Sequence, residues 1–502
     1  MKLVDFLQNL SLKGIRLWSD GEKLKTEGSQ EILTPDIISK LKQHKTEILQ
    51  LLQEQPDIWQ VYPLSYGQKG LRFLWELEPH SYTYNVSFAV RIYYQVNLAT
   101  WQETFEVLRK RHPMLRTTFP KLGQEFIQQI HENQQLDFLE IDASAWSEDE
   151  LYTNVLKAHR YPFNLETQPV MRVRWFSVSA QDHIMLLTIH HIGLDGWSLN
   201  LITKELPEIY QSLQTGSEIS LSQINGSYQD YVNWQMKLLK SRKIDGLWSY
   251  WKQKLSGELP VLNLLTDKPR PQIQTFNGAA YQFKLSEELT GRLKELAQKQ
   301  EVTLYTTLLA TFQILLYRYT GQEDILVGTP TSGRTRPEFA FAPIVGYFAD
   351  QVVMRTDLSG NPRLIDLLIQ VSKTVIEALD HQDYPFSLLV ERLDLEQDSS
   401  RNPLFQAYFL LQKYQESKNV RKLFFSRTKT LVDWGGLQVE PFALDQYEGL
   451  FDITLEMVED DSCMLAFIKY NTNLFDELTI ARMASNYQVL LQEIISNPEQ
   501  RV

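Results

Sequence analysis

Two adjacent histidines and an Asp-Gly pair lie close together in TIHHIGLDGWS, residues 188–198. Histidine exchanges a proton near neutral pH, and a carboxylate beside it can cap a helix or pair with an arginine. The preceding residues, IMLLT, predict a buried strand, and Gly193 and Gly196 allow a tight turn after it. The residue types and spacing predict a proton-handling site at the end of a strand.

Strand geometry separates the two histidines. Successive side chains of a strand point to opposite faces, so only one of His190 and His191 can face a given cavity. Neighbouring strand residues chelate metals poorly, and no third ligand follows at metal-like spacing, so no metal is predicted. The chain also has no Gly-x-Ser-x-Gly motif and no reactive-looking cysteine, and therefore no obvious covalent nucleophile. A histidine of this kind is consistent with direct acyl transfer between two substrates. The alternative is a purely structural role, in which a buried histidine precedes an Asp-Gly turn.

The strand that carries the histidines belongs to a long series of alternating helices and strands. Helices are predicted near 66–77 and 98–111, strands near 84–93, 169–178 and 183–190, and a helix shortly after Asp195. A second mixture of helices and strands runs from 286 to 496, after the proline-rich stretch 259–278. The expected domains are a first lobe at 56–258, a connector at 259–278 and a second lobe at 279–502. Two α/β lobes of similar size predict a pseudo-dimeric arrangement with a cleft.

Residues 1–55 predict a separate small unit. An amphipathic helix begins near Leu3, and strands at 14–18 and 23–28 follow it. Thr34-Pro35 is typical of a helix start, and an apolar stripe continues that helix to about Gln53. An αββα unit of this size has little core, and such units often gain stability from a partner.

The composition of the chain excludes several classes of protein. Of 502 residues, 43% are hydrophobic and 22% charged, which is typical of globular domains. A net charge of −12 argues against nucleic-acid binding, and neither a signal peptide nor a membrane span is apparent. Cys463, the one cysteine, excludes a disulfide framework. We expect a cytoplasmic protein.

Seven motifs in order resemble the condensation domains of non-ribosomal peptide synthetases. HHIGLDG (190–196) matches the family's HHxxxDG motif. The others are LSYGQKGLRFLWEL (64–77), RHPMLRTTF (111–119), YQDYVNW (228–234), VGYFADQVVMR (345–355), HQDYPF (381–386) and SRNPLFQ (400–406). Residues 1–55 are separately similar to TubC-type docking domains, through RLW, the glycine-containing turn and LTP.

The resemblance implies a fold and a reaction. The fold would be two chloramphenicol-acetyltransferase-like lobes in a V with a central tunnel. An acyl or peptidyl donor thioester and an aminoacyl acceptor thioester would be joined as an amide, each held on the phosphopantetheine arm of a carrier protein. The chain itself would bind no cofactor. An upstream donor carrier with a C-terminal docking peptide would be one partner, and a downstream acceptor carrier and an adenylation domain would belong to the same full-length chain.

The resemblance also implies roles for individual residues. His191 would face the acceptor amine, His190 would support the site, and Gly196 would let substrate approach the backbone. Asp195 would hold the loop through an arginine. The candidates for that arginine are Arg334 first, then Arg111 and Arg116, and the tunnel candidates are Trp197, Tyr347 and Asp350.

One motif departs from the usual sequence of the family, and two further features concern the donor and the docking peptide. The family usually has Phe-Val-Asn-Thr where this chain has Phe348-Ala349-Asp350-Gln351, so Asp350 either alters donor preference or lies at the tunnel rim. Residues 65–90 resemble domains that accept polyketide or acyl donors. The docking candidates are Arg16, Trp18, Lys23 and Lys25. The basic side chains of Lys13, Arg16, Lys23 and Lys25 would favour an acidic peptide added as a further strand, or the lysines only protect an edge strand from aggregation.

Three other functions compete with condensation. Epimerisation domains share HHxxxDG but continue differently after Asp-Gly, where this chain has Trp-Ser-Leu. A catalytically silent carrier-docking scaffold is disfavoured by the intact His191, Asp195 and Gly196. A free-standing acyltransferase that uses coenzyme A is disfavoured by the docking unit.

Overall fold

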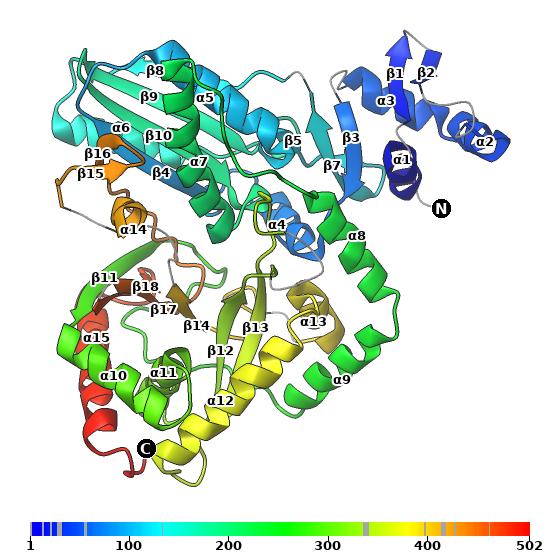
Figure 1. Ribbon diagram of the computed structural model, residues 1–502. Coiled ribbons are helices and arrows are strands. Elements are labelled where there is room, and N and C mark those ends of the chain that lie inside the picture. The colour runs from blue at the N-terminus through cyan, green and yellow to red at the C-terminus, as the bar shows by residue number, and fades with distance from the viewer. Residues whose placement is uncertain are drawn as a thin grey trace. The chain divides into compact units, whose positions relative to one another are not determined.

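A computed structural model gives the fold of the chain (Figure 1). It describes residues 3–12, 15–20, 23–27, 33–54, 58–132, 134–334, 341–395, 398–412, 418–425, 428–460 and 462–502. The chain forms two compact units. The first contains Met1–Lys237, Arg336–Phe348 and Lys422–Leu444, and the second contains Leu238–Thr335, Ala349–Arg421 and Asp445–Val502. The change of unit therefore lies at Leu238 and not in the predicted connector, and two segments of the C-terminal half belong to the first unit.

The N-terminal segment has the predicted order of elements with one added break. Its elements are α1 (Leu3–Leu12), β1 (Arg16–Asp20), β2 (Lys23–Glu27), α2 (Pro35–Gln43) and α3 (Lys45–Glu54). The predicted single last helix is divided at His44, whose backbone (φ −99°, ψ 14°) leaves helical geometry and whose Nδ1 lies 2.9 Å from Glu47 Oε2. Thr34 caps α2 as the sequence predicts.

The core of this N-terminal segment continues beyond it. Its buried side chains pack together with Val61 on β3 (Ile58–Pro63) and Ile127 on β7 (Glu125–His131). The strands β3, β7 and β5 (Thr117–Thr118) form a small sheet, with β6 (Lys121–Leu122) beside β7. The contributing residues of the N-terminal segment are Phe6, Leu7, Leu10, Ile15, Ile37, Leu41, Ile48 and Leu52. These residues and the small sheet share one apolar core.

A six-stranded sheet forms the centre of the first unit. Its order is β15-β16-β4-β10-β9-β8, with β8 parallel to β9 and the other neighbours antiparallel. Alternate residues of β10 enter two cores: Met185 and Leu187 pack on the side of α5 and α7, and Ile184 and Leu186 on the side of α6. The bounds are β4 (Asn85–Ile92), β8 (Asp137–Asp142), β9 (Met171–Ser179), β10 (Asp182–His190), β15 (Val432–Trp434), β16 (Leu437–Pro441), α4 (Tyr66–Leu77), α5 (Leu98–Arg111), α6 (Glu148–His159), α7 (Gly196–Thr215), α8 (Tyr228–Leu239) and α14 (Lys418–Phe425), with 3₁₀ turns η1 (Pro113–Arg116) and η2 (His191–Gly193).

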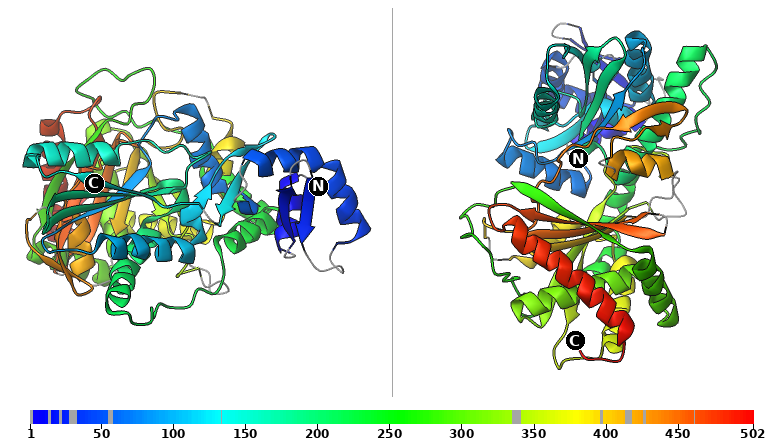
Figure 2. Two further views of the ribbon diagram at one scale, coloured as in Figure 1. Left: turned by 90° about the horizontal axis from the view of Figure 1, so that it is seen from above. Right: turned by 90° about the vertical axis from the view of Figure 1, so that its left-hand side faces the viewer.

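The second unit contains another six-stranded sheet, in the order β11-β18-β17-β14-β12-β13. Its β12–β14 and β14–β17 pairs are parallel. Helix α15 lies along this sheet (Figure 2, right). The bounds are α9 (Lys243–Lys254), β11 (Gly278–Leu285), α10 (Glu287–Lys299), α11 (Leu304–Thr320), β12 (Asp324–Thr331), β13 (Asp350–Asp357), α12 (Leu364–Asp380), α13 (Phe386–Leu393), β14 (Ala407–Gln412), β17 (Ile453–Asp460), β18 (Cys463–Asn471) and α15 (Glu477–Ser496).

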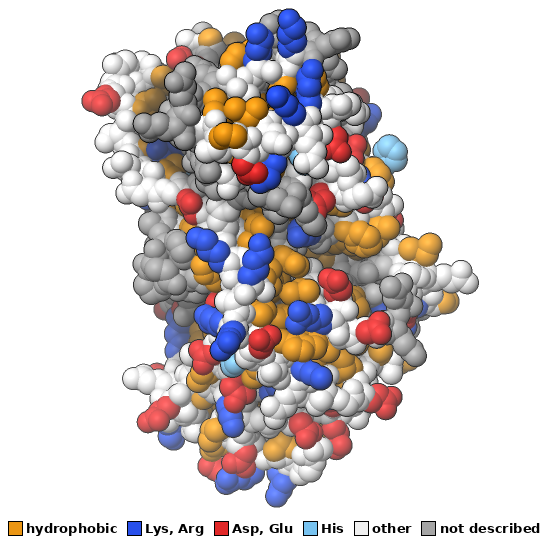
Figure 3. Space-filling model, turned by 90° about the vertical axis from the view of Figure 1, so that its right-hand side faces the viewer, with side chains coloured by type: hydrophobic (Ala, Val, Ile, Leu, Met, Phe, Trp, Pro, Cys, Tyr) orange, Lys and Arg blue, Asp and Glu red, His pale blue; other side chains and the backbone are white. Residues whose placement is uncertain are grey.

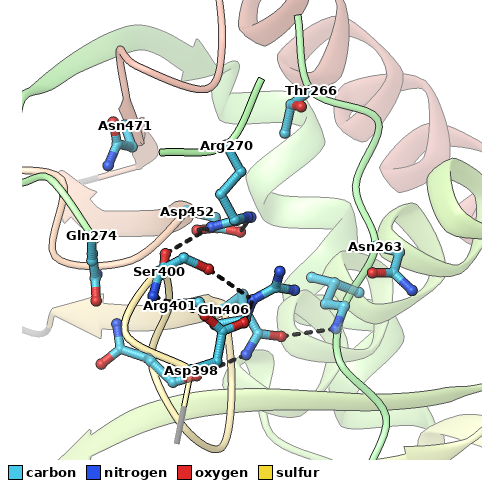
Figure 4. A network of polar contacts seen from close by, with 12 residues as sticks. Asn263, Thr266, Arg270, Gln274, Asp398, Ser400, Arg401, Gln406, Asp452 and Asn471 are labelled. Carbon is cyan, nitrogen blue, oxygen red and sulfur yellow. Dashed lines mark hydrogen bonds and ion pairs between the residues drawn. The ribbon is translucent and has the colours of Figure 1, made fainter. Parts of the chain in front are cut away.

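The stretch predicted as a connector is built into the second unit by polar contacts (Figure 4). Arg270 pairs with the buried Asp452, and its Nη1 donates to the Ser400 carbonyl oxygen at 3.3 Å. The Leu262 amide donates to Gln406 Oε1 at 2.8 Å. Ser400 and Gln406 both belong to the SRNPLFQ motif. That motif therefore holds the stretch in place, which explains why the unit boundary precedes it.

None of the described helices has the length and apolar character that a membrane span requires.

Candidate active site

His190 ends β10 and is a buried, neutral side chain. It is 2% exposed, its ring lies against those of Tyr84 and Phe163, and its Nδ1 accepts a hydrogen bond from the Ile192 amide at 3.1 Å. Burial is the largest cause that lowers its pKa to about 3, and the neighbouring His191 and Arg172 lower it further. His190 therefore carries no charge near neutral pH and supports the turn that follows.

His191 begins the 3₁₀ turn and is partly exposed. Its Nδ1 lies 2.7 Å from the Leu194 carbonyl oxygen. A carbonyl only accepts, so Nδ1 carries the proton and the lone pair of the neutral imidazole is at Nε2. The ring lies edge-on to Tyr347, with centroids 5.3 Å apart at 89°. The turn thus fixes the tautomer that a proton acceptor at Nε2 requires.

Asp195 connects two segments distant in sequence. It is the N-cap of α7, where its Oδ1 accepts from the Ser198 amide at 2.8 Å. Its Oδ2 accepts from the Phe348 amide at 3.2 Å. The side chain is 3% exposed. A buried carboxylate bound by backbone amides from both segments therefore joins the loop after His191 to residue 348.

The two glycines of the motif differ in what surrounds them. A Cβ at Gly193 would lie 2.6 Å from Val170 Cγ2, so close packing requires glycine there. A Cβ at Gly196, the first residue of α7, would meet nothing within 4 Å. Folding alone does not require glycine at 196, and the backbone there borders open space.

The three candidate arginines lie in different surroundings. Arg111 forms an ion pair with Glu205 on α7, its Nε 3.1 Å from Oε2. Arg116 donates from Nη1 to the His131 carbonyl oxygen at 2.5 Å. Arg334 belongs to the second unit, where its amide lies 3.4 Å from Ser332 Oγ. Within the described residues the ion-pair partner of Arg111 is therefore Glu205, and pairing of Asp195 with an arginine stays a prediction.

The three tunnel candidates also differ. Trp197 is 45% exposed, and its indole Nε1 donates to the Ala342 carbonyl oxygen at 2.8 Å. Tyr347 lies on His191, as described above. Asp350 lies in the second unit, where it accepts from the Gln351 amide at 2.8 Å and the Phe386 amide at 3.3 Å. Burial raises the pKa of Asp350 to about 7 despite these two bonds. Asp350 binds the start of α13, within the HQDYPF motif.

The docking candidates lie on a two-stranded sheet. Trp18 is paired with Lys25 across β1 and β2, so both side chains lie on one face. Trp18 is 43% exposed, and Lys23 and Lys25 are exposed. The side chain of Arg16 lies outside the described residues. Figure 3 shows basic and hydrophobic side chains together at the upper end of the molecule.

Several residues that bind the segments around the site were not predicted from the sequence. Ser65 and Gln68 form a capping box at the start of α4, and Gln68 Nε2 donates to the Ile192 carbonyl oxygen at 3.1 Å. The spacing Ser-x-x-Gln is the signal that could have identified the box. Ser198 and Tyr228 bind the segment around Gly346, and no sequence signal links these distant positions.

Two known families match the chain. A condensation-domain model matches residues 58–502, and a TubC N-terminal docking-domain model matches residues 3–54. The chain belongs to the condensation-domain family. The resemblance that the motifs predict is thereby confirmed, and the two six-stranded sheets of the described residues confirm the mixed α/β fold.

Curated relatives of this condensation domain are much longer proteins. It is 34% identical to gramicidin S synthase 2 of Brevibacillus brevis over 87% of its own length and 9% of that protein. Bacitracin synthase 2 of Bacillus licheniformis is 32% identical over 99% of this chain and 19% of the relative. The chain therefore spans a small part of the relatives it matches.

Solved structures share the fold. A four-domain nonribosomal peptide synthetase bound to AMP and glycine superposes with a TM-score of 0.80 at 25% identity, over 88% of this chain and 34% of the other. The first condensation domain of the calcium-dependent antibiotic synthetase, in complex with a substrate analogue, gives a TM-score of 0.71 at 16% identity, over 88% of this chain and 97% of the other.

Proposed function

We propose that this condensation domain joins two carrier-bound thioesters through an amide bond, with His191 as the proton acceptor. The observation that carries the proposal is the bond from His191 Nδ1 to the Leu194 carbonyl, since it leaves the lone pair at Nε2. The family match supports amide-bond formation in general. The acceptor would be an α-amino group, and the donor an acyl, polyketide or peptidyl thioester.

The reaction balances without a covalent enzyme intermediate. The amine nitrogen attacks the thioester carbonyl carbon, the C–S bond breaks, and the sulfur leaves as thiolate. The amine proton passes to Nε2 of His191 and then to thiolate or solvent. No cofactor bound by the chain is part of this proposal, because the phosphopantetheine arms of the carriers present both substrates.

The energetics limit how much His191 contributes. An α-amino group has a pKa of about 7.7–8.0 and a thiol about 8.5, so much of the amine is neutral and the thiolate leaves readily. General-base catalysis contributes about 10²- to 10⁴-fold, and positioning two reactants can contribute more. We therefore propose that His191 positions the amine and relays its proton and is not indispensable.

The decisive experiment uses two loaded carrier proteins and follows the acceptor by intact mass. His191→Ala should lower the rate of mass gain about 10²-fold or more, with residual activity that rises with pH as the free amine increases. His44→Ala, which removes a histidine of the N-terminal unit, is the matched control and should keep the full rate. Total loss of activity at every pH, with carrier binding intact, would establish His191 as an obligatory base.

The same assay separates the alternatives. No mass gain with any of several acyl, polyketide and aminoacyl donors would support the silent scaffold. Exchange of the α-hydrogen of a single carrier-bound residue with deuterated water, without mass gain from a donor, would support epimerisation. Equal turnover of a soluble coenzyme A thioester would support a free-standing acyltransferase.

We further propose that the β1–β2 sheet docks an acidic C-terminal peptide of the upstream synthase polypeptide as an added strand. The exposed Trp18, Lys23 and Lys25 support this proposal. Lys23→Glu/Lys25→Glu should weaken binding of the acidic tail at least tenfold, since two attractions become repulsions. Lys42→Glu/Lys45→Glu makes the same change in net charge on α2 and α3. Equal weakening in both variants would exclude a specific role of the hairpin.

The remaining proposals concern the setting of the domain. On the basis of the family, we propose that a downstream acceptor carrier and an adenylation domain belong to the full-length chain. We also propose a cytoplasmic location.

A further inference from the structure

Residues 341–348 come from the C-terminal half of the chain and belong to the first unit; we call them the crossing segment. The Ser198 hydroxyl donates to the Gly346 carbonyl oxygen at 2.9 Å, and the Gly346 amide lies 3.1 Å from the same hydroxyl. The Phe348 amide binds Asp195, as described above. The start of α7 thus binds the crossing segment on one side.

Tyr228, the first residue of α8, binds the crossing segment from another side. Its hydroxyl donates to the Tyr347 carbonyl oxygen at 2.6 Å, and Ser65 Oγ lies 2.8 Å from that hydroxyl. A Cβ at Gly346 would lie 2.2 Å from Cδ2 of Tyr228, so the ring rests directly on the glycine backbone. Tyr228 is 3% exposed, and its ring also meets Phe348 edge-on at 4.9 Å.

The protonation state of Tyr228 suits a hydrogen-bond donor. Burial is the largest cause that raises its pKa well above the ordinary value, and the nearby Tyr231 raises it further. The hydroxyl therefore keeps its hydrogen over the working pH range and can donate to Tyr347. Residues of three motifs, Ser65, Tyr228 and Tyr347, meet at this hydroxyl.

The contact continues from Tyr347 to the proposed proton acceptor. The Tyr347 ring lies edge-on to His191 with centroids 5.3 Å apart, while its own carbonyl is held by Tyr228. The Leu194 carbonyl fixes the imidazole of His191 through Nδ1. The same imidazole contacts Tyr347, whose backbone carbonyl is bound by Tyr228.

We propose that Tyr228 is a positioning residue, which holds Tyr347 through its carbonyl and thereby keeps the imidazole of His191 in its working orientation. The proposal deepens the proposed function, because it assigns to the YQDYVNW motif a role in setting the proton acceptor. Tyr228 touches neither substrate nor reacting atoms in this account and acts only through Tyr347.

Tyr228→Phe is the sharpest test, because it removes the hydroxyl and keeps the ring on Gly346. Loss of one buried hydrogen bond should lower kcat about tenfold, with the KM for the loaded acceptor carrier within about twofold. Tyr210→Phe, which alters a tyrosine of the same unit stacked on Trp101 at 4.2 Å, is the matched control and should keep the wild-type kcat.

A spectroscopic measurement separates positioning from general stability. In protein labelled on the histidine rings, the His191 signals, assigned from their loss in His191→Ala, should shift in Tyr228→Phe because the Tyr347 ring moves. They should stay in place in Tyr210→Phe. This readout needs no turnover, so it still tests Tyr228 if His191→Ala shows that the proposed function is wrong.

A second variant tests whether the loss in kcat arises from the contact with His191 or from a change in folding. Tyr347→Leu removes the ring beside His191 and keeps the carbonyl that Tyr228 binds. It should reproduce the loss in kcat, and the double variant should be no worse than the more impaired single variant, since both act on one contact. Unchanged His191 signals with wild-type kcat in Tyr228→Phe, or fully additive losses in the double variant, would overturn the proposal.

Discussion

The two neighbouring histidines differ in where each ring carries its lone pair. Nδ1 of His190 accepts from a backbone amide, whereas Nδ1 of His191 donates to a backbone carbonyl. The first ring has its lone pair occupied by the turn, and the second keeps its lone pair at Nε2. Identical residue types thus have different chemistry because the backbone reverses the direction of one hydrogen bond.

Substitution of Gly196 separates an effect on folding from an effect on catalysis. Gly196→Ala should raise the free energy of unfolding by about 0.4–1 kcal/mol, because alanine reduces the conformational freedom of the unfolded chain and its Cβ meets no atom. It should also lower the rate of condensation if substrate approaches this backbone. Thermal unfolding and the mass assay measure the two effects.

Gly246→Ala is the control for that prediction. Gly246 lies within α9, and a Cβ there also meets nothing within 4 Å. This variant should stabilise the protein without changing the rate. A Gly196→Ala protein that is stabilised and fully active would show that no substrate approaches residue 196.

Among the elements of the second unit, the start of α13 is bound by a carboxyl group of β13. Asp350 on β13 receives the Phe386 amide, and Pro385 before it provides no side-chain cap. The motif VGYFADQVVMR is thereby joined to HQDYPF within the second unit. An asparagine at position 350 could accept the same bond without a charge.

Asp350→Asn should change how stability depends on pH. The folded pKa of about 7 lies above the ordinary value of about 3.9. Asp350 therefore contributes stability below about pH 4 and loses that contribution as the pH rises to about 7. The variant should match the wild type at pH 4 and exceed it by about 1–3 kcal/mol at pH 8, as measured by urea unfolding.

Asp267→Asn is a control of opposite sign. The bond from the Asp476 amide, the largest cause, and that from Thr479 lower the pKa of Asp267. The wild-type carboxylate therefore stabilises the fold above its ordinary pKa, and the asparagine variant should lose stability at neutral pH. Parallel curves of stability against pH for wild type and Asp350→Asn would contradict the assignment of Asp350.

The sequence predicts these elements better than it predicts their contacts. Helix 66–77 and strand 183–190 have strong periodicity, and α4 (Tyr66–Leu77) and β10 (Asp182–His190) match them closely. The partner of Arg111 was not foreseen, because Glu205 lies on a different helix and only folding brings the two together. Likewise Ser198 and Gly346 meet through tertiary packing, which local patterns do not record.

At the scale of the molecule, the docking unit shares its core with the condensation domain. Val61 and Ile127, both outside residues 1–55, pack with Phe6 and Leu10 of α1. A small unit with little core thus gains apolar contacts from β3 and β7.

Ile127→Ala should loosen the N-terminal segment. The side chain is fully buried, and its truncation costs about 2–5 kcal/mol, which weakens the packing of α1 on β3 and β7. Hydrogen exchange of the α1 amides should become faster. Ile130→Ala removes an equally buried side chain of the same strand that is not part of this core. Equal acceleration of α1 exchange by both variants would contradict a specific shared core.

The path of the chain between its two units has a consequence for protein engineering. The chain changes unit at Leu238, Arg336, Ala349, Lys422 and Asp445. Consider a chimera in which everything after the proline-rich stretch comes from another parent. The Phe348 amide that binds Asp195 and the glycine under Tyr228 would then come from that parent, whereas His191 would come from the original one. Recombination within this domain therefore has to treat 341–348 as part of the N-terminal parent, although it lies more than one hundred residues downstream of His191.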